Sequence, residues 1–168
     1  MENKLLESVL KVCKVLNKHS VQYLVVGGTA VGFHGYVRMS YDPSGVVMDK
    51  HDLDFWYNPT YNNYYNLLNA LEELERDVTR YRNEKTPDPN KSFFRFEEQY
   101  FKMDFLPKLS GLTRFRLSYE NRCDVEIDDI KVSYIGYDDL VKSKLALARD
   151  KDIYDIEQLK IRNSTPEE

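Results

Sequence analysis

The chain has 168 residues, and at roughly 100 to 200 residues per domain this length predicts one domain and excludes a second full catalytic domain. Apolar residues make up 42% of the chain and charged residues 31%, which is enough apolar material for a core and too much for a disordered chain. With 24 Lys and Arg against 28 Asp and Glu, the formal charge of −4 offers no overall positive field to nucleic acid or anionic lipid. Polyanion binding therefore has to be local.

The sequence carries no sign of export or of membrane association. Its N-terminal segment alternates charged and apolar residues and lacks the continuous apolar run of a signal peptide. No stretch approaches the length that would span a bilayer. The two cysteines, Cys13 and Cys123, are too few for a disulfide framework or a cysteine zinc site. We therefore expect a cytoplasmic protein.

The first part of the chain is expected to contain two helices and one strand. Apolar residues at helical spacing predict an amphipathic helix over the first 18 residues, on Leu5, Val9, Val12 and Leu16. The short apolar run at 23–26 ends at a glycine pair, which predicts a buried strand entering a tight turn. Residues 29–34 then suit a short helix. Residues 36–51 lack a clear period, which predicts a loop or an irregular hairpin.

The middle of the chain is expected to hold three strands and one long helix. Polar and apolar side chains alternate over residues 52–57, which predicts a strand. Thr60 is the predicted N-cap of a helix whose apolar face is formed by Leu67, Leu71, Leu74 and Val78. After a loop at 85–90, residues 93–98 and 100–105 predict two further strands.

The last part is expected to change from strands to helices. A further strand pair is predicted at 113–119 and 131–135. Asp138 is the predicted cap of a helix over 139–148, and a last helix is predicted at 152–161.

This order of elements indicates an α/β or α+β fold, with a mixed sheet flanked by helices and a helical C-terminal end. The sequence contains no internal repeat and no low-complexity segment. The chain is therefore predicted to form a single domain over residues 1–163, with a frayed tail at 164–168.

Three acids differ from the others by their context. Asp52 and Asp54 lie two apart on a predicted strand, so both side chains point to one face while Leu53 and Phe55 point into the core. Asp104 is set in the same way on a strand that could pair beside the first. Three convergent carboxylates form a hard oxygen site suited to Mg²⁺ or Mn²⁺.

The acids alone do not identify a site. With 28 acids in the chain, chance gives about five acid-x-acid triplets, so Asp52 and Asp54 also fit a solvated strand face. Gly27, Gly28 and Thr29 add a second feature, because a glycine pair between a strand and a helix lets backbone N–H groups approach a phosphate chain. The alternative is an ordinary strand-to-helix turn. Together, these parts in this order are those needed for metal-assisted nucleotidyl transfer.

The motifs resemble the polymerase-β-like nucleotidyltransferase superfamily, and within it the small prokaryotic branch that includes the AbiEii-type toxins. The resemblance rests on Gly27-Gly28-Thr29-Ala30, on His34-Gly35 and Arg38, on Asp52-Leu53-Asp54-Phe55, on Met103-Asp104-Phe105-Leu106, and on the runs 139–146 and 149–155. It spans about residues 22 to 160 and departs from the family where residues 42–49 look inserted. Such an insertion could cover the site or alter the choice of acceptor.

The resemblance implies the nucleotidyltransferase fold and transfer of NMP from an NTP to an acceptor with release of pyrophosphate. It implies that Asp52 and Asp54 bind Mg²⁺ or Mn²⁺ and that Asp104 is a metal ligand and candidate base. Gly27, Gly28 and Thr29 would hold the triphosphate, and Lys144 would reach a phosphate from a C-terminal helix. The acceptor stays open between a small molecule, a tRNA and a protein. The alternative function is an inactive nucleotide-binding or partner-binding module, such as one component of a toxin–antitoxin pair with a partner protein.

Several residues have two interpretations. Without the resemblance, Lys144 reads as a solvated lysine. Asp152 and Asp155 either share a functional helix face or form surface ion pairs. Arg38 either contacts a phosphate or anchors the inserted segment. A basic stretch either binds an acceptor or balances the acids that follow it, and consists of Lys108, Arg114, Arg116 and Arg122.

Histidines and tyrosines near the motifs are interpreted as structural. His34 and His51 flank motif residues but lack a spaced third metal ligand. Tyr61, Tyr64 and Tyr65 are more consistent with packing than with base stacking.

Overall fold

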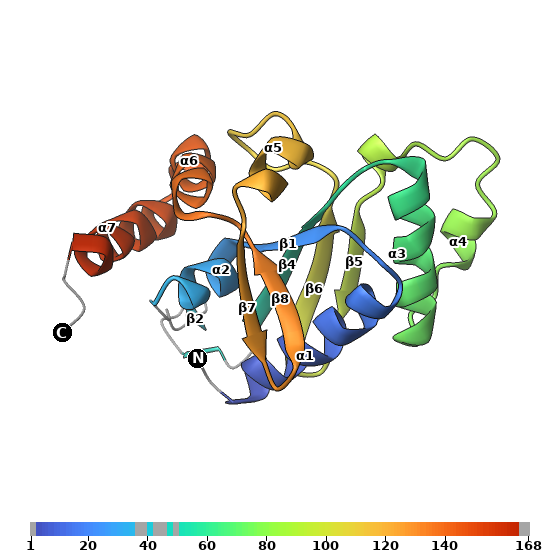
Figure 1. Cartoon of the computed structure of the whole chain (residues 1–168), viewed down its shortest axis with the longest axis horizontal. Helices are drawn as coiled ribbons and strands as arrows, with labels where there is room; N and C mark the ends of the chain where they lie inside the picture. The colour runs from blue at the N-terminus through green and yellow to red at the C-terminus, as the bar shows by residue number, and fades with distance from the viewer. Residues whose placement is uncertain (1–2, 36–39, 42–46, 49–50, 165–168) are drawn as a thin grey trace.

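The computed structural model describes residues 3–35, 40–41, 47–48 and 51–164. Within this part of the chain, a mixed sheet is formed by β1 (Tyr23–Val26), β4 (His51–Tyr57), β5 (Phe94–Glu97), β6 (Phe101–Leu106), β7 (Cys123–Ile127) and β8 (Ile130–Tyr134). The helices are α1 (Asn3–Lys18), α2 (Gly27–Phe33), α3 (Tyr61–Glu73), α4 (Thr79–Arg82), α5 (Phe115–Glu120), α6 (Tyr137–Leu147) and α7 (Asp150–Ser164), with a 3-10 turn at Pro89–Lys91 (Figure 1). The predicted α/β architecture with C-terminal helices is confirmed. None of the described helices is long and apolar enough to cross a membrane.

The sheet has the strand order β5-β6-β4-β1-β8-β7. Strand β4 lies at its centre, antiparallel to β1 and parallel to β6. In this register Asp54 faces Val26 on one side and Asp104 on the other. The expected pairing of the two acid-bearing strands is therefore confirmed.

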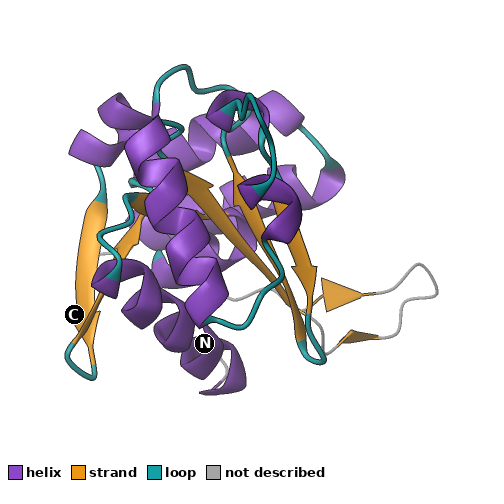
Figure 2. Ribbon diagram, turned by 90° about the vertical axis from the view of Figure 1, so that its right-hand side faces the viewer, coloured by secondary structure: helices purple, strands orange, loops and turns teal. Residues whose placement is uncertain are grey.

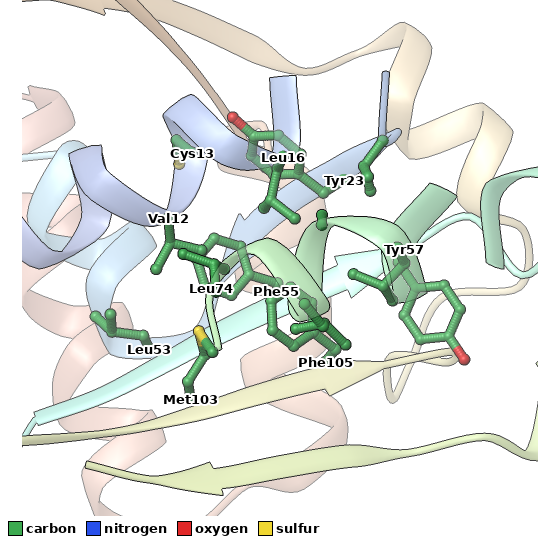
Figure 3. Close-up of a cluster of buried hydrophobic side chains, with 14 of the residues drawn as sticks. Val12, Cys13, Leu16, Tyr23, Leu53, Phe55, Tyr57, Leu74, Met103 and Phe105 are labelled. Atoms are coloured by element: carbon green, nitrogen blue, oxygen red, sulfur yellow. The ribbon is translucent and has the colours of Figure 1, made fainter. Parts of the chain in front are cut away.

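Helices cover both faces of the sheet (Figure 2). One face packs against α1 and α3, and Figure 3 shows its core around Leu53, Phe55, Tyr57, Met103 and Phe105. On the other face, side chains of β1 and β4 pack against α2, α5, α6 and α7. Because side chains alternate along a strand, Asp52, Asp54 and Trp56 belong to this second face.

Several predicted elements have nearly the predicted bounds. Helix α1 and strands β1, β4, β5 and β6 lie where periodicity places them. Thr60 caps α3, since its side chain accepts a hydrogen bond from the Asn63 N–H at 3.3 Å. The helix ends at Glu73, because Glu75 adopts a left-handed φ of 61°, and Val78 lies beyond the helix although it is buried.

The segment 36–51 is described only in part. Strands β2 (Ser40–Tyr41) and β3 (Val47–Met48) pair antiparallel, which agrees with the predicted irregular hairpin. Arg38 lies outside the described residues, and so do residues 42–46 and 49 of the inserted stretch.

The predicted strand at 113–119 is wrong, because this segment forms helix α5. Its buried residues Phe115 and Ser118 are three apart, and the rings of Phe115 and Tyr119 stack 5.3 Å apart, which is helical spacing. The partner of β8 is instead β7. Asp128 and Asp129 form the turn of this hairpin with φ of 52° and 62°. Turns with this conformation usually contain Asn-Gly or Asp-Gly, and the pair Asp-Asp is a weaker sequence signal for a hairpin.

The C-terminal helices also differ from expectation. Helix α6 begins at Tyr137 after Gly136, so the predicted capping by Asp138 is wrong, and Asp138 lies in the first turn. There its charge is favourable because it faces the positive end of the helix dipole. Ala148 has a left-handed φ of 48° and separates α6 from α7, which is longer than predicted.

Candidate active site

A cavity of about 100 Å³ opens where β1 turns into α2. It is lined by all but one of the predicted site residues, namely Gly27, Gly28, Thr29, Asp52, Asp54 and Lys144. The remaining one, Asp104, lies directly beside Asp54 in the β4–β6 ladder. The structure thus brings together residues that are far apart in the sequence.

The glycine pair forms the first turn of α2, which begins two residues earlier than predicted. Gly27 has a φ of 64°, and a Cβ atom added there would lie 2.5 Å from Oδ2 of Asp54. Only glycine therefore allows the backbone to pass this close to the carboxylate. The backbone N–H groups of a first helical turn have no partner within the helix, which makes them available to an anion.

The replacement Gly27→Ala is expected to destabilise the protein by about 1 to 3 kcal/mol, because it combines a strained φ with a clash against Asp54. Chemical denaturation measures this loss. In an Asp54→Ala background the clash with Oδ2 is absent, so the same replacement should cost at least about 1 kcal/mol less. An equal cost in both backgrounds would contradict the close approach.

Asp52 and Asp54 lie on one face of β4, as predicted, while Leu53 is buried on the other. Burial, and then the charges of Asp52 and Asp104, raise the pKa of Asp54 to about 7. The positive charges of Lys144 and Lys151 act in the opposite direction. A site that disfavours its own carboxylate charge gains from a bound cation.

Asp104 is buried and bound by an arginine that the sequence analysis did not single out. Both oxygens accept hydrogen bonds from Arg95, with Nε 2.9 Å from Oδ1 and Nη2 2.8 Å from Oδ2. Arg95 lies opposite Asp104 in the β5–β6 ladder, so only the strand register could have revealed this pair.

The donor set fits a magnesium-like ion on two carboxylates. In the described part of the chain, no three His, Cys, Asp or Glu side chains gather in an arrangement that could hold a metal. Mg²⁺, however, is usually bound through one or two carboxylates, with water and substrate phosphates completing its shell. Asp52 and Asp54 at the cavity meet that requirement.

The hydroxyl of Thr29 has a structural contact. It is buried and donates a hydrogen bond to the backbone carbonyl of Asp52 at 3.1 Å. This bond ties α2 to β4 and holds the glycine turn against the acidic strand. Because the hydroxyl has donated its only proton to this carbonyl, any hydrogen bond from Thr29 to a phosphate oxygen uses its backbone N–H.

Lys144 is buried beside the cavity and paired with two acids. Its Nζ lies 3.0 Å from Oδ2 of Asp155 and 3.4 Å from Oδ1 of Asp152. Both acids are fully buried, so the interpretation as surface ion pairs is wrong. The packing of α7 on α6 creates this cluster, which the spacing along the chain does not reveal.

Arg149 completes the cluster. Its Nε donates to Oδ2 of Asp152 at 2.6 Å. Burial opposes the charged form of Asp152, but the hydrogen bond from Arg149 and the charge of Lys144 outweigh it and lower the pKa of Asp152. Arg149 and Lys151 also line the cavity, and sequence reasoning missed both. The signal was the run of alternating charge at 149–152, which is also typical of a solvated helix face.

Among the remaining candidates, His34 and Tyr64 make structural contacts, whereas His51 is part of the cavity wall. Nε2 of His34 lies 2.8 Å from the carbonyl of Ile135. Tyr64 is buried against Phe94, as the packing interpretation predicts, whereas Tyr61 and Tyr65 are exposed and the interpretation is wrong for them. His51 lines the cavity.

The four residues of the basic stretch lie in two different environments. Lys108, Arg114 and Arg116 line a second cavity of about 580 Å³. Nε of Arg122 instead lies 3.1 Å from Asp124, so the charge-balance interpretation is confirmed for this residue.

Comparisons with known proteins identify the fold. No protein-family model matches the chain, and no curated protein matches its sequence. The structure is similar to that of an antigenic nucleotidyltransferase-like protein from Paracoccidioides brasiliensis, with a TM-score of 0.56 and 14% identity over 99% of this chain and 79% of that one. It is also similar to the lincosamide antibiotic adenylyltransferase LnuA in its lincomycin-bound form, with a TM-score of 0.54 and 16% identity over 95% of this chain and 97% of that one. The chain therefore has the fold of the nucleotidyltransferases.

Proposed function

We propose that the protein is a metal-dependent nucleotidyltransferase of the cytoplasm, which moves NMP from an NTP to an acceptor and releases pyrophosphate. One observation carries the proposal: the close approach of the Gly27 backbone to Asp54, with Asp52 and Asp104 on the same face of the sheet. This arrangement places a phosphate-binding backbone beside carboxylates that suit a divalent cation.

In this proposal Asp52 and Asp54 hold the metal, Mg²⁺ or Mn²⁺. When bound, the metal neutralises charge on the triphosphate and on the departing pyrophosphate. The N–H groups of Gly27, Gly28 and Thr29 hold phosphate oxygens. Arg149 and Lys151 add positive charge at the rim of the cavity.

Lys144 keeps a role toward phosphate in spite of its acidic partners. A lysine ammonium has three N–H donors, and two of them point toward Asp155 and Asp152. The third is available to a phosphate oxygen in the cavity that Lys144 lines.

Asp104 is the proposed base. The acceptor transfers its proton to this carboxylate, the acceptor atom bonds to the α-phosphorus, and the bond between that phosphorus and the pyrophosphate oxygen breaks. Because Arg95 binds both oxygens of Asp104, the guanidinium has to loosen its contact before the proton is accepted.

The acceptor class stays open between a small molecule, a tRNA and a protein. LnuA is named as a lincosamide antibiotic adenylyltransferase, which makes a small molecule one acceptor class to test. The relation to AbiEii-type toxins, and with it a partner protein, stays a prediction from the motifs.

A second candidate is a nucleotide-binding module of the same fold without turnover. The observation that favours it is the pairing of Asp104 with Arg95 and of Lys144 with Asp155, since the proposed base and the proposed phosphate-binding lysine already carry counterions. Calorimetric titration with each NTP and Mg²⁺, combined with a pyrophosphate assay, separates the candidates. Binding with pyrophosphate release supports the enzyme, tight binding without release supports the module, and no binding contradicts both.

A further inference from the structure

Arg95 forms an ion pair beside the candidate metal site, because its partner Asp104 lies next to Asp54 in the sheet. It sits in β5 directly opposite Asp104 of β6, and its fork-shaped guanidinium bonds each carboxylate oxygen separately. Such a bidentate pair is geometrically specific and is stronger than a hydrogen bond between neutral groups. Both oxygens of Asp104 are thus engaged by a cation that belongs to the protein itself.

The two partners differ in their freedom to move. The Asp104 side chain is 12% exposed, whereas that of Arg95 is 56% exposed. Strand β5 is an edge strand, and the guanidinium lies 5.2 Å from the centre of the Phe93 ring on that edge. The carboxylate is therefore fixed in the sheet, while the guanidinium can leave toward solvent without any change in the backbone.

Arg95 also lies within the field of the other two acids. The hydrogen bond and the charge of Asp104 raise the pKa of Arg95, and Asp52 and Asp54 raise it further. A divalent cation at Asp104 would be next to this guanidinium, and two cations at such a distance repel each other. Asp52 and Asp54, by contrast, line the cavity on the side of the glycine turn.

We propose that Arg95 is a built-in competitor for the metal at Asp104. The resting protein then takes up one divalent cation at Asp52 and Asp54, and Asp104 becomes a ligand only after the guanidinium leaves. This inference rests on the metal site of the proposed function. It assigns to Arg95 a role that a simple cross-strand ion pair does not have, namely control over the number of metals bound.

The test is direct titration of the full chain with Mn²⁺ in the absence of nucleotide, with unbound Mn²⁺ read by electron paramagnetic resonance. The wild-type protein should bind one equivalent. Asp52→Asn should weaken this binding at least tenfold, whereas Asp104→Asn should change it less than twofold. Arg95→Met should add a second equivalent or tighten binding at least tenfold, and Asp104→Asn in that background should remove the gain.

Two further variants serve as controls. Arg82→Met removes an arginine of α4 whose Nε lies 2.9 Å from Oε1 of Glu72 in α3. This pair lies away from the site (Figure 1), so the replacement should leave Mn²⁺ binding unchanged. Arg95→Lys keeps the charge but loses the fork, and should give an intermediate gain. If thermal unfolding shows that Arg95→Met fails to fold, Mn²⁺ binding by Arg95→Lys and by Asp104→Asn still tests whether Arg95 competes with the metal at Asp104.

Each remaining outcome is decisive. Equal weakening by Asp104→Asn and Asp52→Asn in the wild-type background, or unchanged binding in both Arg95 variants, overturns the inference and leaves the proposed function intact. Absence of Mn²⁺ binding in the wild-type protein and in the Arg95 variants overturns the metal site of the proposed function, and the inference with it.

Discussion

The replacement Asp54→Asn is expected to reduce nucleotidyl transfer by about 10²- to 10³-fold, the order of loss caused by removing one preorganised electrostatic group. The same replacement should stabilise the metal-free protein at pH 8. Both effects have one cause, since Asp54 is held against the Gly27 backbone and beside two other acids, where its charge is costly without a cation.

The pH dependence follows from the raised pKa. Asp54 titrates at about 7 in the folded protein and has an ordinary value of 3.8. Between these values the folded state keeps a proton that the unfolded state has lost, so stability falls as the pH rises from about 4 to 7. The full shift corresponds to about 4 kcal/mol, and solvent screening of this partly exposed group reduces the expected loss to about 1 to 2 kcal/mol.

Denaturation in EDTA at pH 5 and pH 8 measures this loss. The wild-type protein should lose stability between the two values, and Asp54→Asn should lose less by about 1 to 2 kcal/mol. Added Mg²⁺ should raise the melting temperature of the wild-type protein more at pH 8 than at pH 5, and that of the variant at neither. An identical pH dependence in both proteins would contradict the raised pKa.

The second large effect concerns Lys144. Lys144→Met should destabilise the protein by about 3 to 5 kcal/mol, because it leaves Asp152 and Asp155 fully buried with one cation fewer. Lys142→Met is the matched control, since Lys142 is an exposed lysine of the same helix and its replacement should cost less than about 0.5 kcal/mol.

A double variant identifies the cause of this loss. Adding Asp155→Asn to Lys144→Met removes one of the stranded charges and should restore part of the stability, as measured by urea denaturation. Equal stability of Lys144→Met and Lys142→Met would show that the cluster does not hold α6 to α7.

Local patterns in the sequence were sufficient for much of the fold. The helical spacing of apolar residues in α1 and the alternation of polar and apolar residues in β4 arise because one face of each element is buried, and this burial makes both elements predictable from periodicity. The pattern failed at 113–119, where Phe115 and Tyr119 belong to a short helix and Phe115 packs against Trp56 of the distant strand β4. Six residues carry too little periodicity to separate a helix from a strand.

The candidate site was predictable in its carboxylates but not in its counterions. Asp52 and Asp54 share a face by the geometry of any strand. The binding of Arg95 to Asp104 depends on strand register, and the binding of Lys144 to Asp155 depends on how α7 packs on α6. Both ion pairs depend on tertiary structure. The sequence therefore shows the charged residues but does not show which of them pair.

The most direct test is incubation of the protein with each α-phosphate-labelled NTP, a divalent metal and cell lysate, followed by identification of the labelled molecule. We expect that one NTP transfers its label to a discrete acceptor, that pyrophosphate appears in equal amount, and that EDTA abolishes and Asp54→Asn strongly reduces both. Absence of labelling with every NTP in Mg²⁺ and in Mn²⁺, or undiminished labelling by Asp54→Asn, would contradict it.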